Sequence, residues 1–355
     1  MRLEFSWQLP LGNEGALLDQ ASWAQQPGEW IQLAQAVEYA GIDQLWIPAG
    51  PGQADSLGVA AALCAHTRNL GLTVSIAPEV MLPAALAATA QSLQSISGNR
   101  LRLHLPDSEQ SNVRRVFGEF LNRDQRSERI GEYMTILGQL LRPPSTPSSV
   151  PLNFSGRYFQ LENAGIARRN LPAPALILDD SQSGALLADH ADWCLLRPGH
   201  PHWLRKEIHR LQRAAEQQGR SLRFACNLGL IVRSSEEQAW DAAQTYLANS
   251  ADRVLATSRA LDSEQIIEMS RQHQQVRRHE IHPNLWRPFS DRPALLVGTP
   301  RQVATRLQEL HGLGVNHISL QALPAVSEAL RFAEQILPLL QSQGLREEED
   351  SRAES

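Results

Sequence analysis

Residues 294–320, ALLVGTPRQVATRLQELHGLGVNHISL, decide the fold because they contain one complete helix-to-strand repeat. Apolar residues recur at helical spacing over Arg301–Leu313, and a short apolar strand follows at His317–Gln321. The same alternation of short apolar segments and longer amphipathic ones extends back to the N-terminus. It predicts a chain built from strand–helix units.

Eight strands are predicted, and they are Leu3–Leu9, Gln44–Pro48, Leu70–Ile76, Leu101–Leu105, Ala175–Leu178, Trp193–Leu196, Arg223–Val232 and His317–Gln321. The amphipathic segments predict helices at Gly28–Tyr39, Pro83–Ile96, Ser181–His190, His202–Gln218, Ser235–Asn249 and Arg301–Leu313. Helical crossovers imply parallel pairing, and eight such strands favour a closed (β/α)8 TIM barrel of the α/β class. An open doubly wound sheet is the alternative.

Three segments interrupt the alternation, at about 106–124, 142–171 and 250–295. The second contains a predicted hairpin around Phe154–Leu161. Two of them follow the fourth strand and one follows the seventh, and long insertions in a compact domain are often functional loops. We predict a single barrel domain over residues 1–342 and an acidic, unpacked tail over residues 343–355.

The composition excludes several classes of protein. The chain has 355 residues, is 42% hydrophobic and carries a net charge of −5, which argues against general nucleic-acid binding. Its three cysteines are widely spaced, so we expect no disulfide framework, no metal site and a cytoplasmic location. No signal peptide and no membrane-spanning segment is predicted.

In a β/α barrel, function lies at the carboxyl ends of the strands. The residues predicted at those ends are Gln53, His104, Asp107, Asp179, Asp180, Asn227, Gly229, Leu323 and Ala325. No Ser-His-Asp spacing and no metal-ligand spacing stands out among them. The chemical groups that usually carry catalysis at these positions of a barrel are largely absent from this set.

Several strings resemble the bacterial luciferase-like family, and specifically its alkanesulfonate monooxygenase branch. They are YAGIDQLWIPAG (39–50), NFSGRYFQLENA (153–164), FACNLGLIVRSSEEQAW (224–240), HPNLWRP (282–288) and the stretch at 294–320. Their order and spacing match over roughly residues 3–340. The resemblance implies a barrel of the luciferase-like type that takes reduced FMN from a partner reductase. With oxygen, such enzymes form a flavin peroxide that cleaves the carbon–sulfur bond of a sulfonate.

The catalytic positions depart from the family pattern. Gln53 stands where the family has a Cys, and His104 and Asp107 stand where it has an Asn and a Thr near the flavin ring. Asn227 and Gly229 replace an Arg and a His that face the same side of the seventh strand. The resemblance makes His104, Gln53 and Asn227 the catalytic candidates. His104 is interpreted either as a base or as an inert polar residue at the end of the strand.

After the eighth strand, the family's Tyr-Pro-His is replaced by Leu323-Pro324-Ala325, while Arg100 is retained ahead of the fourth strand. In the 250–295 insertion, the family uses arginines to clamp the sulfonate. The candidates for a substrate lid here are Arg287, Arg292 and Trp286. A solvated loop face is the alternative interpretation of the arginines.

The residues expected to bind the FMN phosphate also differ from the family pattern. Family members present Gly-Gly-Ser-Ser after the fifth strand, where helix-start amides hold the FMN phosphate. This chain reads Asp179-Asp180-Ser181-Gln182-Ser183-Gly184, and two carboxylates oppose a dianion. Asp107, Ser181, Ser183 and Gly184 are the candidates for cofactor binding. A helix cap is the alternative role of the aspartates.

Two functions follow from the resemblance and its departures. The first is a two-component FMN-dependent oxidoreductase in which sulfonate cleavage is diverged or lost. The second is a catalytically degenerate subunit, or a small-ligand-binding protein, that pairs with an active paralogue. Expected partners are a flavin reductase or that paralogue, in a homo- or hetero-oligomer.

Overall fold

The computed structural model describes residues 2–11, 26–107, 111–142, 151–166, 171–257, 276–289 and 292–346. The chain forms two compact units. Unit 1 comprises Met1–Asp43, Leu196–Ile208 and Phe224–Ser355, and unit 2 comprises Gln44–Leu195 and His209–Arg223. The prediction of a single domain stays a prediction.

Unit 2 is built on neighbouring parallel strands in the order β2, β3, β4, β7 and β8. Their bounds are β2 (Gln44–Ile47), β3 (Gly71–Ser75), β4 (Leu101–Leu105), β7 (Ala175–Asp179) and β8 (Trp193–Leu196). The helices are α2 (Ser56–Cys64), α3 (Pro83–Ser97), α4 (Ser111–Val116), α5 (Arg123–Leu141) and α6 (Gly184–His190). All five strands were predicted, whereas α2, α4 and α5 were not.

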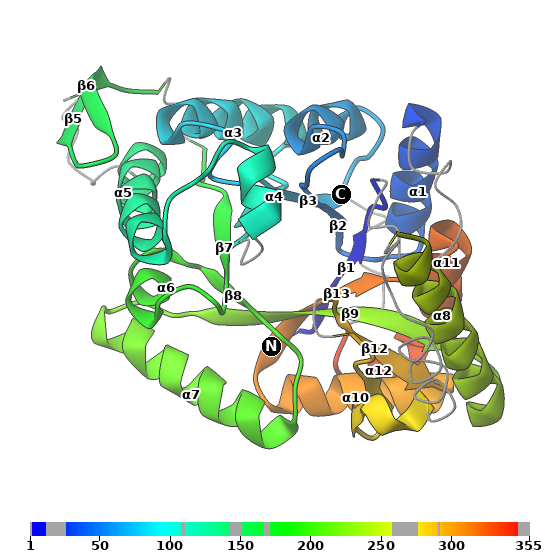
Figure 1. Cartoon of the computed structure of the whole chain (residues 1–355). Coiled ribbons are helices and arrows are strands. Elements are labelled where there is room, and N and C mark those ends of the chain that lie inside the picture. The colour runs from blue at the N-terminus through cyan, green and yellow to red at the C-terminus, as the bar shows by residue number, and fades with distance from the viewer. Residues whose placement is uncertain are drawn as a thin grey trace. The chain divides into compact units, whose positions relative to one another are not determined.

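The predicted hairpin in the second insertion is confirmed. Strands β5 (Leu152–Ser155) and β6 (Gln160–Ala164) pair antiparallel beside one end of α5 (Figure 1). The Glu132 carboxylate of α5 accepts hydrogen bonds from the backbone N–H groups of 157–159, at 2.7, 2.9 and 3.0 Å. One side chain therefore holds the hairpin turn against the helix.

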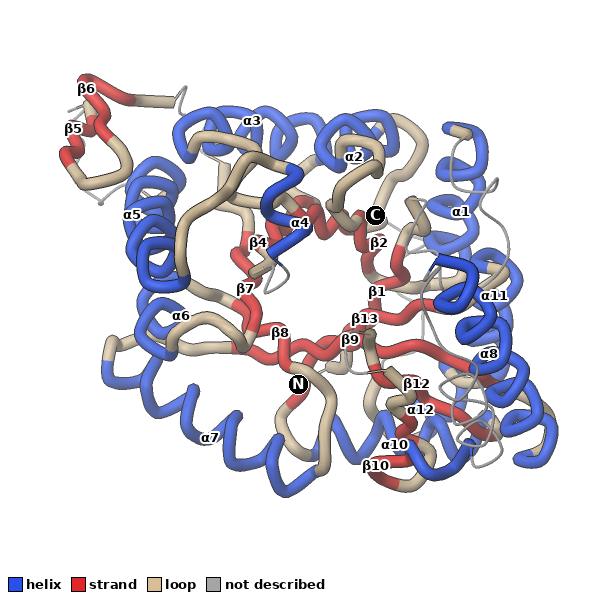
Figure 2. The backbone as a smooth tube through the Cα atoms, viewed as in Figure 1, coloured by secondary structure: helices blue, strands red, loops and turns tan. Residues whose placement is uncertain are grey.

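Unit 1 contains the parallel strands β12, β9, β13 and β1 in that order, with a small antiparallel extension from β12 through β11 to β10 (Figure 2). The strand bounds are β1 (Glu4–Gln8), β9 (Arg223–Val232), β10 (Glu280–His282), β11 (Leu285–Trp286), β12 (Ala294–Gly298) and β13 (Val315–Gln321). The helices are α1 (Pro27–Tyr39), α8 (Glu236–Thr257), α10 (Pro300–Gly312), α11 (Ala325–Gln335) and α12 (Leu337–Ser342), and α7 (Pro201–Gln217) runs through both units.

The strand β12 was not predicted: its first two residues fall at the end of the third insertion, and no strand was assigned to residues 296–298. All five of its residues are buried, between β9 in the sheet and the helices α8 and α10. The segments 258–275 and 290–291 of that insertion lie outside the described residues, as do residues 347–355 of the predicted tail. Within the predicted tail, Leu345 O accepts from Leu3 N and Arg346 donates to Asp43 at 2.7 Å.

Candidate functional site

A pocket of about 440 Å³ lies at the carboxyl ends of β3, β4 and β7, all within unit 2. Its walls come from the segments that follow these three strands and from the first turns of α5. The residues that line it are Pro78, Glu79, Pro106, Asp107, Glu119, Arg123, Arg126, Ser127, Arg129, Ile130, Ser181, Gln182 and Ser183. Ligand pockets commonly enclose about 300–1,000 Å³, so this one is large enough for part of a cofactor.

Helix α5 supplies the positive charge of the pocket. The helix begins with a capping box in which Asn122 and Gln125 bond each other's backbone N–H groups, which fixes its first turn. Arg123, Arg126 and Arg129 follow at three-residue spacing, so they share one face of the helix. All three line the pocket.

Carboxylates partly neutralise these arginines. Asp107 Oδ1 lies 3.6 Å from Arg126 Nη1, and Glu119 Oε2 lies 3.9 Å from Arg129 Nη1. The Arg129 Nη2 also donates to Pro78 O at 3.1 Å. Burial raises the pKa of Glu79 above its ordinary value, its own backbone N–H and Arg129 act against that rise, and Glu119 and Asp107 add to it. Three arginines and three carboxyl groups therefore share this space.

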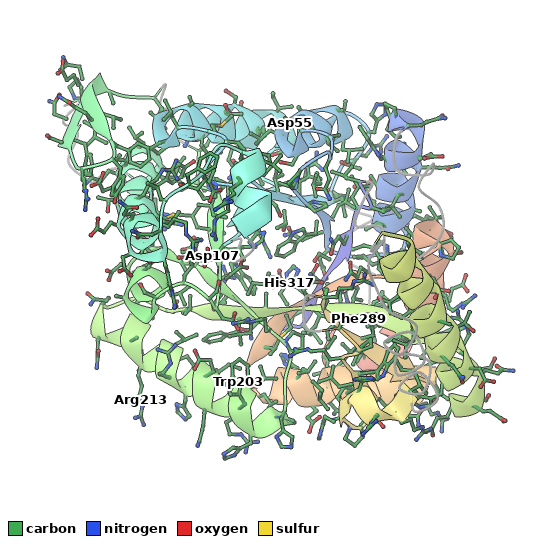
Figure 3. All side chains as sticks on the ribbon, viewed as in Figure 1. Asp55, Asp107, Trp203, Arg213, Phe289 and His317 are labelled. Carbon is green, nitrogen blue, oxygen red and sulfur yellow. The ribbon has the colours of Figure 1, made fainter. Side chains whose placement is uncertain are left out.

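Three of the four predicted cofactor-binding residues lie together in this pocket: Asp107, Ser181 and Ser183. Ser183 caps α6 by accepting from Leu186 N at 3.2 Å, and its hydroxyl hydrogen can still be donated to a ligand. Gly184 is different, because a Cβ there would lie 2.9 Å from Nη1 of Arg210. Its lack of a side chain makes room for that guanidinium. Asp107 is labelled in Figure 3.

His104 forms the centre of a buried hydrogen-bonded series. Its Nδ1 lies 2.9 Å from Ser75 Oγ, and its Nε2 lies 3.0 Å from Asp179 Oδ1. Trp46 Nε1 donates to the same Ser75 oxygen at 3.0 Å, and the other Asp179 oxygen accepts from the backbone N–H of Asp107 at 2.8 Å. The series links residues of β2, β3, β4 and β7. No spacing in the sequence had suggested it.

The partners of the two ring nitrogens hold the imidazole in place. A neutral imidazole satisfies both partners when the Ser75 hydroxyl donates to Nδ1 and Nε2 donates to Asp179. Both ring nitrogens are used, and His104 is only 6% exposed. The geometry is that of a structural polar chain.

The other residues singled out in this unit lie apart from the pocket lining. Gln53 lies in the turn after β2, where its backbone N–H donates to Gly50 O at 3.2 Å. Asp180 N donates to Leu195 O at 3.0 Å. Arg100, at the start of β4, donates to Ser97 O and to other acceptors at the ends of α2 and β3. Its retention therefore has a structural explanation.

In unit 1, Asn227 and Gly229 of β9 pair in register with Ser319 and Gln321 of β13 and share one face of the strand, as predicted. A Cβ at Gly229 would lie 2.9 Å from the Leu295 side chain, so Leu295 occupies the space beside this glycine. Among the described residues, no group bonds the buried Oδ1 of Asn227.

The end of the eighth barrel strand is apolar here. Ala325 is 1% exposed and begins α11, and Leu323 is half-buried just before it.

The lid candidates are held by contacts within unit 1. Trp286 is fully buried, donates to Val276 O at 2.7 Å and packs edge-to-face against Trp240. Arg287 donates to Pro198 O, and the Arg292 guanidinium lies 4.5 Å from the centre of the Phe289 ring. A role for these residues in binding substrate stays a prediction.

Sequence reasoning missed the arginine face of α5 and Glu79. The signal was present as RDQRSER (123–129), with arginines three residues apart just after an Asn cap. Over the part of the chain that the structure describes, no group of three or more His, Cys, Asp or Glu side chains is placed to hold a metal ion. None of the described helices is both long enough and apolar enough to cross a bilayer.

Comparisons with solved structures identify the fold. EDTA monooxygenase from Chelativorans sp. BNC1 superposes with a TM-score of 0.74 and 19% identity, covering 98% of this chain and 95% of that one. A long-chain alkane monooxygenase superposes with a TM-score of 0.75 and 16% identity, covering 98% of this chain and 93% of that one. A riboflavin lyase, solved with modified FMN and substrate riboflavin, superposes with a TM-score of 0.76 and 17% identity, covering 97% of this chain and 92% of that one. This likeness confirms the α/β class and the TIM barrel.

The family model for luciferase-like monooxygenases matches residues 3–317. That span includes the pocket, the His104 series and every strand of the barrel up to the last. The chain therefore belongs to the luciferase-like monooxygenase family.

Proposed function

We propose that this chain binds reduced FMN through its phosphate in the unit 2 pocket and has lost the cleavage of alkanesulfonates. The observation that carries the proposal is the pocket itself, which gathers Asp107, Ser181 and Ser183 beside the arginines of α5. Three residues chosen as cofactor ligands from sequence alone thus lie in one cavity.

The donor set fits a phosphate group. Guanidinium groups bind phosphate oxygens in fork geometry, and serine hydroxyls add neutral donors. Arg123 and Arg126 from α5 and Ser181 and Ser183 from the loop after β7 are the residues that would hold it. The pocket has a polar lining at the end of parallel strands, where α/β proteins bind phosphorylated ligands. The riboflavin lyase, whose title names a modified FMN, has the same fold.

When bound, reduced flavin supplies the electrons for the family's chemistry with oxygen. The residues of this chain bind and orient the phosphate through Arg126 and the serines. The proton-transfer step is where the chain departs from the alkanesulfonate branch. Asn227 and Gly229 stand where the family has an Arg and a His, and the ring of His104, which replaces a family Asn, is fixed by its contacts with Ser75 and Asp179.

The remaining parts of the proposal concern partners and location. A flavin reductase would supply the reduced cofactor, as the resemblance to two-component monooxygenases implies. An oligomer with itself or with an active paralogue is part of the same proposal. We place the protein in the cytoplasm, where its three buried cysteines would stay reduced.

The test has two arms. Purified protein is titrated with FMN and, under anaerobic conditions, with reduced FMN, while flavin fluorescence or heat is followed. Micromolar binding that weakens on Arg126→Ala supports the proposal, and the absence of binding at hundreds of micromolar overturns it. In the second arm, the protein is supplied with a flavin reductase, oxygen and a series of alkanesulfonates. Sulfite release above the background without protein would contradict the loss of sulfonate cleavage.

A further inference from the structure

The charge balance of the pocket raises a question about how it accepts a phosphate. Its described lining carries three arginines and three carboxyl groups. If all six are ionised, the pocket has no net charge, and a dianion gains little by entering it. The two carboxylates closest to arginines, Asp107 and Glu119, are ion-paired at 3.6 and 3.9 Å. Glu79 is the third.

Glu79 lies in the connection between β3 and α3 and lines the pocket opposite α5. The charged and titratable groups that face it are Arg129 and Tyr133 from α5, Glu119 from the connection before α5, and Asp107 from the segment after β4. Tyr133 is fully buried, and burial raises the pKa of its phenol, so it stays neutral. Glu79 therefore has one positive and two negative neighbours.

We propose that Glu79 takes up a proton from solvent when this pocket binds a phosphate-bearing ligand, so that binding is linked to protonation. The inference rests on the proposed function, namely that the pocket holds the flavin phosphate. It adds a residue and a pH dependence that the phosphate ligands alone do not imply. One O–H bond forms on the carboxylate of Glu79, with a proton taken from solvent or buffer, and no other bond changes.

The physical reason is repulsion in a confined space. An ionised carboxylate and a phosphate dianion in one pocket repel each other, and partial burial strengthens the repulsion relative to water. Protonation of Glu79 removes that repulsion and leaves the described lining with an excess of one positive charge. Burial of this carboxyl group already favours its neutral form, as the raised pKa of Glu79 shows. The ligand shifts the same equilibrium further.

The experiment measures FMN affinity between pH 6.5 and 8.5 in the wild type and in Glu79→Gln, which cannot ionise. At pH 8, we expect E79Q to bind FMN at least about tenfold more tightly than the wild type, and the difference to shrink toward pH 6.5. The titration of the FMN phosphate itself affects both proteins equally. Glu162→Gln is the matched control, because Glu162 is an exposed carboxylate on β6. Riboflavin, which lacks the phosphate, should show no difference between the variants.

A second measurement needs no variant. Calorimetry of FMN binding to the wild type at pH 8, in two buffers of different ionisation enthalpy, reports net proton uptake directly. Uptake with FMN and none with riboflavin is expected, and this arm decides the matter if E79Q does not fold. FMN binding with equal pH profiles in both proteins, or without proton uptake, overturns the role of Glu79 alone. An absence of FMN binding to wild type and E79Q at every pH overturns the proposed function instead.

Discussion

Replacement of His104 by alanine separates a structural role from a catalytic one. The change removes a hydrogen bond with Ser75, a charge-assisted one with Asp179 and an edge-to-face contact with Trp46 at 4.9 Å. A neutral hydrogen bond contributes about 1 kcal/mol, one to a charged group about 1.5–3, and an aromatic pair about 0.5–1.5. Since His104 is buried, we expect a loss of about 3–5 kcal/mol in the free energy of unfolding.

Urea unfolding followed by tryptophan fluorescence and by far-UV circular dichroism measures this loss, provided that the two probes coincide. His209→Ala is the matched control, because His209 is exposed on α7, and it should change stability by less than about 0.5 kcal/mol. A cycle with Asp179→Asn should show a coupling of about 1 kcal/mol or more between the two sites. An H104A protein of wild-type stability would refute the structural role.

Three further outcomes are expected. Gly156→Ala should cost about 1–3 kcal/mol in urea unfolding, because a Cβ there would lie 2.3 Å from Glu132 Oε2 and displace the carboxylate that holds the hairpin turn. Arg100→Lys should destabilise by a similar amount, about 1–3 kcal/mol, because an ammonium group cannot reach acceptors on three segments at once. Burial raises the pKa of Glu328, so the folded protein favours the protonated carboxyl group. The stability that this preference contributes is fully present below pH about 4.5 and is lost as the pH rises through the raised pKa. Thermal melting should therefore show that Glu328→Gln gains stability relative to wild type from pH 5 to 8.

The sequence contained enough information for the strands but not for their side-chain partners. Apolar runs such as Leu101–Leu105 are short and bounded by polar turns, so the eight strands of the barrel were predicted within one or two residues. By contrast, β12 has an equally apolar run, and it was missed because its neighbours in sequence read as a polar insertion. Helix α5 was missed as well: most of it lies between the first two insertions, where no helix was assigned, and the arginines of the pocket were missed with it.

The site was partly predictable. The resemblance to the luciferase-like family was sufficient to choose Asp107, Ser181 and Ser183, and the carboxyl ends of parallel strands bring these residues to one edge. The partners of His104 were not predictable, because Ser75 and Trp46 meet it through the register of three parallel strands. The pairing register of strands that are separated in the chain could not be read from this sequence alone.

The hydrogen-bonded series through His104 restricts how its residues can be substituted during evolution. Its inner links depend on one another: an imidazole without Asp179 loses the acceptor of its proton, and Asp179 without the imidazole is a partly buried carboxylate that keeps only the Asp107 N–H among these bonds. Exchange of either residue alone passes through a less stable protein. We therefore expect positions 104 and 179 to vary together among relatives, with the pair His and Asp gained or lost as a unit.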